Sequence, residues 1–424
     1  RATEPGPRLL VRLARLGELL FRPLERRRRR SARSLRPIRS GHAPGRHPVA
    51  LPPVQPEPHP PPDAPGRVAI VGAGIAGLSL ACALQRAGFT VDIYERDEGP
   101  ATQGAGLTLW PNAVRVLREV GLGDALDAVA HRLSEAATVT PDGSVLTRIP
   151  LDRLEPRFGP LVSVHRPELL AALTERVKAP VRYGAHVRFE DGALTVDDAP
   201  LEADLIVGAD GIGSQVRELV APGVSPRPAG YAAWRGVART GADTPHGATE
   251  AMGGGHRFGL VPLSGGRTYW FAVVPGAGAD ANLQEIFAGW HEPIAAVLAA
   301  PQTDAASLLG IADLPPLPRW HRGNAVLVGD AAHATTPNLG QGAALALADV
   351  ATLARLLAER PLAEALPAYE RARKKRAEAI VRQSRQVGRT AQLASPLACR
   401  LRNAAMRAIP AGLMARRFSA ILAP

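Results

Sequence analysis

The sequence of 424 residues contains only two cysteines, Cys82 and Cys399. Two cysteines cannot build a disulfide framework, and Cys82 lies in an apolar helical stretch, so a reducing cytoplasm is the expected location. No run of about 18 uninterrupted apolar residues occurs, and the closest, residues 343–358, is broken by Asp349 and Arg355. The sequence therefore predicts no transmembrane helix.

Lysine is also scarce, with three lysines among 51 basic residues, which indicates a coding bias toward arginine. The net charge of +12 is unevenly distributed: residues 1–66 contain 14 arginines and five acidic residues, which leaves only +3 for the other 358 residues. The globular part is therefore close to neutral. It offers no basic face for phosphates, and we expect no nucleic-acid partner.

Residues 1–66 differ in composition from the rest of the chain. They include five consecutive arginines at 26–30 and a Pro-rich stretch at 43–65 without apolar periodicity. Such a composition predicts a disordered Arg/Pro-rich extension. Residues 9–24 could form a short basic amphipathic helix, so a membrane-surface or targeting role stays open.

A glycine-rich turn opens the globular sequence at the end of a short apolar strand, residues 68–71. The turn reads Gly72-Ala73-Gly74-Ile75-Ala76-Gly77 and leads into a helix over residues 78–87. Gly72 makes the turn, Gly74 lets the backbone approach a pyrophosphate, and Gly77 lets helix and strand pack closely. The helix N-terminus supplies N–H groups and the positive end of its dipole. Glu95 ends the next strand, where a carboxylate can accept hydrogen bonds from ribose hydroxyls.

Two further motifs distinguish FAD from NAD as the dinucleotide. Residues 204–211 read Asp-Leu-Ile-Val-Gly-Ala-Asp-Gly, and residues 323–333 read Gly-Asn-Ala-Val-Leu-Val-Gly-Asp-Ala-Ala-His, followed by Pro-Asn-Leu-Gly-Gln-Gly at 337–342. Together with the glycine turn, these motifs resemble the three fingerprints of the flavoprotein aromatic hydroxylases, the family of p-hydroxybenzoate and salicylate hydroxylases. The resemblance covers residues 67–390. Trp110-Pro111-Asn112 and the segment 259–269 look most like the salicylate and urate hydroxylase branch.

The resemblance implies an α/β fold in which a Rossmann-like FAD-binding domain is interleaved with a mostly antiparallel substrate-binding sheet. The expected FAD-binding parts are 67–137, 160–225 and 316–372. The expected substrate domain is 138–159 and 226–315, followed by a C-terminal helical segment, 373–424. The implied activity uses noncovalent FAD, transiently bound NAD(P)H and O₂ to hydroxylate a small aromatic or heteroaromatic substrate through a flavin C4a-hydroperoxide. We expect no metal and a monomer or homodimer.

The resemblance also assigns cofactor roles to individual residues. Glu95 should hold the adenosine ribose, Arg166 should contact the flavin, and Asp330 should accept hydrogen bonds from the ribityl chain or an adjacent hydroxyl. Asp210 is expected near both FAD and the nicotinamide, and His333 is expected to be structural rather than catalytic. The expected cofactor set is Gly72, Gly74, Ala76, Gly77, Glu95, Arg96, Thr108, Arg166, Val187, Asp210, Asp330, Gly340, Gln341, Gly342, Ala343 and Ala344.

The flavin loop carries both a physical expectation and a departure from the family pattern. Residues 340–344 should place a helix N-terminus beside the flavin, where backbone N–H groups stabilise the anionic reduced form. The family often has Asn at the position of Ala344 and Glu at the position of Ala348. These changes bear on the tuning of the flavin and not on its binding.

The substrate site is expected on the aromatic-rich sheet. Arg257, Tyr269 and His256 are the candidate catalytic residues, with Arg257 orienting an anionic group of the substrate. Ordinary sheet packing of the aromatic residues and solvation of the arginines remain the alternative. Relatives that hydroxylate urate have Asp where this chain has Asn338, which cannot act as a base, so urate itself is disfavoured and His256 is the substitute base. The candidate pocket residues are Tyr231, Trp234, Arg235, Trp270, Pro337 and Asn338.

Three other functions stay open at this point. A flavin-dependent epoxidase would use the same oxygen chemistry, and an FAD-dependent reductase or dehydrogenase would use the same cofactor fold. A flavin-binding scaffold anchored by the basic N-terminal extension is the non-enzymatic alternative. The absence of a Trp-x-Trp-x-Ile motif argues against halogenation, and the absence of a second glycine fingerprint agrees with a nicotinamide that binds only transiently.

Overall fold

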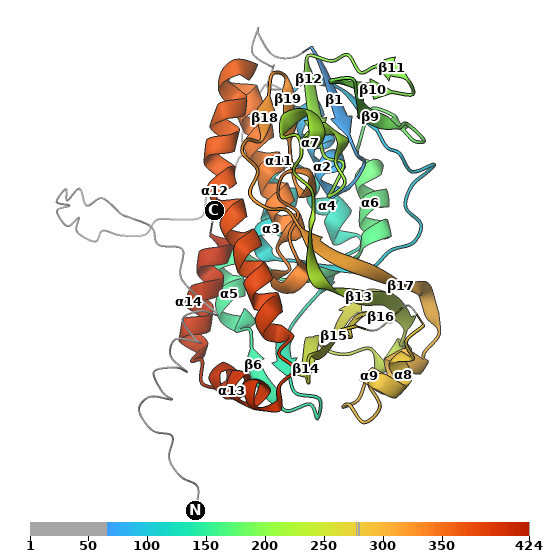
Figure 1. Ribbon diagram of the computed structural model, residues 1–424, viewed down its shortest axis with the longest axis vertical. Coiled ribbons are helices and arrows are strands. Elements are labelled where there is room, and N and C mark those ends of the chain that lie inside the picture. Colours follow the sequence, from blue (N-terminus) through green and yellow to red (C-terminus); the bar gives the residue numbers. More distant parts are fainter. Residues whose placement is uncertain (1–65, 277, 279, 424) are drawn as a thin grey trace, which may run out of the picture.

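The computed structural model describes residues 66–276, 278 and 280–423, so the predicted extension lies, except for Gly66, outside the described residues. A six-stranded sheet forms the upper half of the molecule in Figure 1. Its strands, in spatial order, are β18 (His321–Arg322), β19 (Ala325–Leu327), β12 (Leu205–Gly208), β1 (Arg67–Val71), β2 (Thr90–Tyr94) and β8 (Val181–Arg182). The strands from β19 to β8 are parallel, as βαβ connections require.

Helices cover this sheet, which explains why β1 and β12 are nearly continuous apolar runs. Helix α2 packs on β1 and β2 and also on α11, and α11 packs on α3 and α12. The helices of this part are α2 (Ile75–Arg86), α3 (Pro111–Glu119), α4 (Gly123–Asp127), α6 (Arg166–Thr174), α7 (Gln215–Val220), α10 (Asp330–His333), α11 (Gly342–Glu359) and α12 (Leu362–Ala391). Short 3-10 turns occur at Gly241–Asp243 and Pro337–Leu339.

A seven-stranded sheet forms the lower half. Its order is β17 (Gln302–Asp313), β13 (Arg227–Arg239), β16 (Arg267–Val273), β15 (His256–Leu263), β14 (Ala248–Gly253), β5 (Ala136–Val139) and β6 (Val145–Arg148). All neighbours are antiparallel except β14 and β5. Phe287, directly after helix α8 (Leu283–Ile286), and Ile294 of helix α9 (Ile294–Ala299) belong to an aromatic core on one face of this sheet.

Smaller elements join the two halves. A three-stranded sheet of β3 (Gly106–Leu109), β7 (Val162–His165) and β4 (His131–Arg132) lies at this junction, against β15. A second one, β9 (Val187–Glu190), β10 (Ala193–Val196) and β11 (Ala199–Pro200), packs on α7 in the upper half instead. Arg267 of β16 donates to both carboxylate oxygens of Glu168 in α6, at 2.7 and 3.0 Å. The imidazole Nε2 of His165 lies 2.7 Å from the Asp304 carboxylate of β17. These polar contacts tie the seven-stranded sheet to the dinucleotide part.

The C-terminal helices complete the molecule. Helix α12 runs along most of its long axis, beside both sheets, and leads into α13 (Pro396–Arg407) and α14 (Ala411–Leu422) at the left of Figure 1. Helix α14 packs against α5 (Leu151–Phe158). The arrangement confirms the predicted α/β class with an interleaved antiparallel sheet and C-terminal helices. In the part of the chain that the structure describes, no helix has the length and apolar character to span a membrane.

Candidate active site

The glycine-rich turn after β1 has the geometry that a dinucleotide needs. Gly72 has φ of +104°, and a Cβ there would lie 2.5 Å from the carbonyl oxygen of Ala209; a Cβ on Gly77 would lie 1.9 Å from the carbonyl oxygen of Gly72. Both glycines are therefore required by the fold itself. Gly74, the N-cap of α2, has an ordinary extended φ of −77°, and a Cβ on it would meet nothing within 4 Å. The open space in front of this helix N-terminus fits an anionic pyrophosphate.

Glu95 lies directly after β2, beside this turn. Its Oε2 accepts a hydrogen bond from the Ala73 backbone N–H at 2.7 Å, and its Oε1 accepts one from Asp97 N–H at 3.1 Å. The carboxylate is thus held at the mouth of the turn, where the resemblance places the adenosine ribose. Arg96 beside it is solvent-exposed, whereas Val187 is buried at the start of β9 in the main core.

Asp210 follows β12 and accepts hydrogen bonds from the beginning of α7. Its Oδ2 accepts hydrogen bonds from the backbone N–H groups of Gln215 and Val216 at 2.7 and 3.2 Å, at the beginning of α7. Burial raises the pKa of this carboxyl, and hydrogen bonds from Ser214 and the backbone partly oppose the shift. Its Oδ1 is buried without a hydrogen-bond partner in the described structure. Oδ1 is therefore the carboxylate oxygen that keeps its full capacity to accept a hydrogen bond.

Asp330 begins α10, at the carboxyl end of β19. The carboxyl pKa is raised by desolvation, while the nearby charges of His333 and Arg166 lower it. Arg166, at the beginning of α6, is exposed and lies close enough to Asp330 for this effect. Thus two exposed residues that the sequence separates by more than 160 positions lie near each other in the fold.

His333 belongs to a buried network at the end of the short helix that Asp330 begins. Its Nε2 lies 2.5 Å from Oδ2 of Asp349, which also accepts the Gly329 N–H at 3.0 Å, and Arg373 donates to Oδ1 of the same carboxylate at 2.8 Å. Desolvation opposes ionisation of Asp349, but its interactions with His333 and Arg373 outweigh this effect and lower the pKa of the carboxyl group. The network anchors the backbone that carries Asp330, in agreement with the structural role expected for His333.

The predicted flavin loop lies at the beginning of α11. Gly340 has φ of +60°, and Gln341 and Ala344 are buried, whereas Gly342 and Ala343 are partly exposed. Asn112 Nδ2 donates to Gln341 Oε1 at 3.1 Å, but Gln341 Nε2 is buried without a partner in the described structure. An unpartnered buried donor is costly unless a ligand or water accepts from it. The donor, the helix N-terminus and the open glycine turn together fit a bound FAD.

The face of the seven-stranded sheet opposite the aromatic core brings together most of the predicted substrate residues. Because side chains alternate along a strand, Tyr231, Arg235, Arg257 and Tyr269 share this face. A Cβ on Gly106 would lie only 2.3 Å from Cβ of Tyr269, so Tyr269 sits directly against β3 of the dinucleotide part. Thr108, two residues further along β3, faces the same way as Gly106.

Three predicted residues lie on the other face, which corrects the sequence-based expectation. Trp234 and Trp270 are buried in the core formed with Phe258, and the Phe258 and Trp270 rings stack with centroids 5.8 Å apart. His256 contacts Phe287 edge-on in the same layer, at 6.3 Å between centroids. The two-residue period of a strand puts all three side chains opposite Arg257 and Tyr269. They therefore line no common pocket with them, and His256 cannot serve there as the substitute base.

Arg257 is committed to internal partners. Its side chain is only 4% exposed, and its Nε lies 2.6 Å from Oε1 of Glu250 on β14. Its Nη1 donates to Asn338 Oδ1 at 2.7 Å, and Asn338 Nδ2 donates in turn to the Tyr231 hydroxyl at 3.0 Å. The network fixes the loop after Pro337 to the sheet. Sequence reasoning missed Glu250; the Gly253-Gly254-Gly255 turn, which predicts a β14–β15 hairpin, is the signal that could have placed it beside Arg257.

Arg235 differs from Arg257 because it has no hydrogen bond or ion pair to any described residue, and its Nε is buried. It lies near Tyr269, whose phenol pKa is raised to about 12 by burial and lowered by a smaller amount by the Arg235 charge. The phenol therefore stays protonated at any physiological pH and can donate a hydrogen bond. The combination offers a positive charge and a neutral donor side by side.

A separate groove of about 450 Å³ lies at the edge of the same sheet. Its lining comes from β5, β6 and β14 and from the segments 242–247 and 291–293. It contains none of the predicted site residues, so we do not associate it with the chemistry. Among the residues that the structure describes, no cluster of His, Cys, Asp and Glu is arranged to hold a metal ion.

The dinucleotide fold is joined to the seven-stranded sheet, whose face opposite the aromatic core, here called the inner face, carries Arg235 and Arg257. This combination is that of an FAD-dependent oxidoreductase with a separate substrate layer. Comparison with known proteins agrees: the family model described as "FAD binding domain" matches residues 66–384. Aurachin C monooxygenase/isomerase of Stigmatella aurantiaca is 36% identical over 357 residues, covering 80% of this chain and 93% of the relative. The 3-amino-4-hydroxybenzoate 2-monooxygenase of Streptomyces cremeus is 37% identical over 368 residues, covering 81% and 92%.

A solved structure has the same fold. Klebsiella pneumoniae HpxO complexed with FAD and uric acid superposes with a TM-score of 0.75 at 28% identity, covering 84% of this chain and 97% of that chain. The chain belongs to the FAD-binding-domain family of flavoprotein aromatic hydroxylases. It is an FAD-dependent monooxygenase that uses NAD(P)H and O₂ to hydroxylate a small aromatic or heteroaromatic substrate. The predicted family, fold, cofactor and reaction are thereby confirmed, and monooxygenation is favoured over the alternatives.

Proposed function

We propose that this enzyme hydroxylates a small, planar, electron-rich ring that bears one anionic group, and that Arg235 binds this group. The observation that carries the proposal is the Arg235 guanidinium, whose buried Nε has no partner in the described structure. A buried N–H left unpaired costs free energy, which an anionic ligand would recover through a charge-assisted hydrogen bond.

The charges on the inner face of the sheet support one anionic group. Glu250 offsets Arg257 through their short contact, whereas Arg235 has no acidic partner among the residues that the structure describes. A ligand with a single carboxylate, or with one ionised N–H or hydroxyl, would balance it. A carboxylate accepts two parallel hydrogen bonds from a guanidinium, and an ionised nitrogen or hydroxyl accepts a charge-assisted hydrogen bond from it.

The remaining residues of this face would orient the ring. Tyr269, held protonated, would donate a hydrogen bond to an oxygen or nitrogen of the substrate. Tyr231, Asn338 and Arg257 would hold the loop after Pro337 against the sheet and exclude water from the space between them. None of the predicted residues on this face can act as a general base that would ionise the substrate. We therefore expect a ring that is electron-rich through its own substituents.

The FAD would be held by the parts described above. The turn at Gly72–Gly77 and Glu95 would bind the adenylate half, Arg166 and Asp330 would face the flavin and ribityl groups, and residues 340–344 would lie beside the flavin ring. Bound FAD supplies the transfer of electrons from NAD(P)H to O₂ and the activated oxygen atom. We further propose that the enzyme works as a monomer or homodimer in a reducing cytoplasm, consistent with its two free cysteines.

Matched pairs of compounds test the substrate class. Small aromatic and heteroaromatic carboxylates and the corresponding carboxamides would be screened for stimulation of NAD(P)H oxidation, with product mass and ¹⁸O₂ incorporation as the decisive readout. We expect the anionic member of a productive pair to have a kcat/KM higher by about one to two orders of magnitude, since a charge-assisted hydrogen bond contributes about 1.5–3 kcal/mol. Equal kcat/KM values for acid and amide would contradict the proposal.

The Tyr269→Phe variant tests the role of the phenol. We expect kcat/KM to fall by roughly three- to tenfold, the effect of one neutral hydrogen bond. Because the phenol has a pKa of about 12 and is neutral below that pH, its removal should leave the pH profile unchanged up to about pH 10. If the variant removed an alkaline limb from the profile, Tyr269 would be titrating and the assignment as a donor would be wrong.

A further inference from the structure

Helix α14, at the end of the chain, packs on a residue that touches the flavin loop. The Phe418 ring stacks on the Trp110 indole, with centroids 5.0 Å apart and planes inclined by 16°. Leu422, one turn later, is fully buried in the same apolar cluster. The cluster also contains Leu154 of α5 and Val261 of β15, so α14 covers the junction between the dinucleotide part and the substrate sheet.

Trp110 and Asn112 connect this cluster to the flavin loop. A Cβ on Gly340 would lie 2.8 Å from Nε1 of Trp110, so the indole is in close contact with the loop backbone. Asn112, two residues after Trp110, donates to the Gln341 side chain at 3.1 Å. The position of the α3 N-terminus therefore restricts where Gly340 and Gln341 can lie. Helix α14 supports that N-terminus through the stacking of Phe418 on Trp110.

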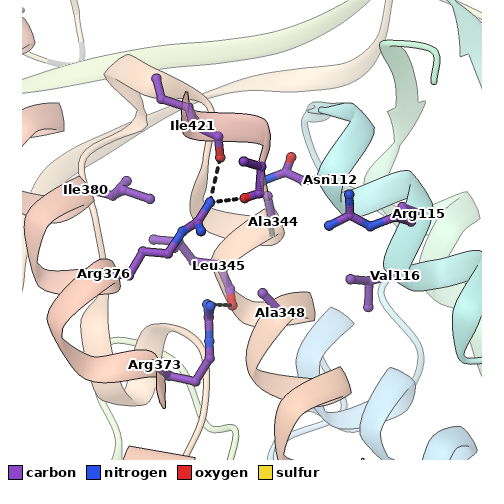
Figure 2. A pocket seen from close by; sticks show the side chains of 11 residues that line it. Asn112, Arg115, Val116, Ala344, Leu345, Ala348, Arg373, Arg376, Ile380 and Ile421 are labelled. Carbon is purple, nitrogen blue, oxygen red and sulfur yellow. Dashed lines mark hydrogen bonds between the residues drawn. The ribbon is translucent and has the colours of Figure 1, made fainter. Parts of the chain in front are cut away.

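A second contact holds the far end of α14 in place. A cavity of about 40 Å³ lies between α3, α11, α12 and α14. Arg376 of α12 points toward the end of α14 in it (Figure 2). Arg376 Nη2 donates to the Ile421 carbonyl oxygen at 3.0 Å and also to that of Ala423. The last carbonyl groups of a helix lack partners within the helix and carry its negative dipole end, so a guanidinium is well suited to them.

Small side chains on α11 leave room for this arrangement. Ala344 and Ala348 line the cavity beside Asn112, and Arg373 lies at its base, where it donates to the Leu345 carbonyl oxygen (Figure 2). Longer side chains at these two positions would fill the space that separates α11 from the end of α14. The loop that begins α11 is thus supported at Gly340 and Gln341 by residues at the start of α3, which α14 covers, in addition to the contacts of Asn338 with the sheet.

We propose that α14 is a positioning element of the cofactor site, with Phe418 as its principal positioning residue. By holding Trp110 and Asn112, it keeps the backbone N–H groups of residues 340–344 directed at the flavin, where they stabilise the negative charge of the reduced form. The inference rests on the proposed placement of the flavin beside this loop. It predicts that a change in α14, remote from the substrate residues, alters both FAD affinity and flavin reduction potential.

The Phe418→Ala variant of the full chain tests this. We expect the dissociation constant for FAD to rise about tenfold, or ~1.4 kcal/mol, comparable to the loss of one stacked aromatic contact. The midpoint potential, measured on FAD-saturated protein, should become more negative. The Phe418→Tyr variant keeps the stacked ring, so its FAD dissociation constant and midpoint potential should equal those of the wild type. Leu413→Ala is the matched control, since Leu413 is on the same helix and 42% exposed; it should match the wild type.

Other outcomes separate the role of α14 from the proposed function. A Phe418→Ala protein with a lower melting temperature but wild-type FAD affinity and potential would show that α14 only stabilises the fold, and would overturn the inference. Equal effects of Leu413→Ala would overturn it as well. If the wild-type protein failed to bind FAD at all, the assignment of the cofactor site would fail instead.

Discussion

The Gly74→Val variant is expected to fold normally and to lose its FAD. The backbone at Gly74 is extended, so valine fits it without strain, and the added side chain would occupy open space in front of the α2 N-terminus. That space is where a pyrophosphate would receive the N–H groups of the helix. Losing two charge-assisted hydrogen bonds costs about 4 kcal/mol, a roughly thousandfold weaker affinity for FAD. Fluorescence titration with FAD, alongside a melting curve of the apoprotein, measures both effects.

Two glycine variants serve as controls for this result. Gly77→Ala should destabilise the apoprotein itself, because its Cβ would lie 1.9 Å from the Gly72 carbonyl oxygen. Gly310→Val, in β17 of the other sheet, adds the same side chain where nothing lies within 4 Å, and it should keep both stability and FAD affinity. Normal FAD binding by Gly74→Val would exclude the turn as the pyrophosphate site. An unfolded Gly74→Val protein would show that the fold itself requires Gly74.

The Arg235→Gln variant is expected to bind FAD normally but to use its substrate poorly. Glutamine keeps donors but removes the charge, so KM should rise by roughly ten- to hundredfold, the value of a charge-assisted hydrogen bond. A ring that is no longer held in place is hydroxylated less often, and NAD(P)H consumption should yield hydrogen peroxide instead of product. Steady-state kinetics with peroxide and product quantified in the same samples would measure both effects.

Arg239→Gln is the matched control, because Arg239 is on the same strand and is exposed. It should have wild-type kinetics. Arg257→Gln should behave differently from Arg235→Gln: it leaves Glu250 without its partner and releases Asn338, so thermal stability should fall together with turnover. A wild-type KM and tight coupling in Arg235→Gln would show that another group binds the substrate.

The substrate sheet shows where sequence reasoning reached its limit. The aromatic-rich segments were correctly expected to form a sheet, and Arg235, Arg257 and Tyr269 do share one face of it. His256, Trp234 and Trp270 were expected in the same pocket but lie on the opposite face. A strand reverses the direction of its side chains at every residue, so a pocket cannot be assigned until the register and the covered face are known. Those depend on α8 and α9, which pack against one side of the sheet.

The pairing of the two arginines shows the same limit. Their place in the aromatic-rich segments made both arginines candidates for binding an anionic substrate, with Arg257 expected to orient it and Arg235 to line the pocket. The structure shows that Arg257 is neutralised by Glu250 and bonded to Asn338, more than 80 positions away, whereas Arg235 has no partner in the described structure. A charge on a strand is free or paired according to which side chains the neighbouring strands bring beside it, and this cannot be read from its own segment.

The sequence by itself determined the cofactor half of this protein, because the motifs at 72–77, 204–211 and 323–342 act through local backbone geometry. A glycine turn between a strand and a helix leaves space in front of the helix N-terminus, and this space can hold a pyrophosphate in any chain that contains the motif. Only the tertiary structure decided the substrate half and the support of the flavin loop. The contact of Arg257 with Asn338 joins residues 81 positions apart, and that of Phe418 with Trp110 joins residues more than 300 positions apart. Such contacts follow from how the sheets and helices pack and not from local sequence.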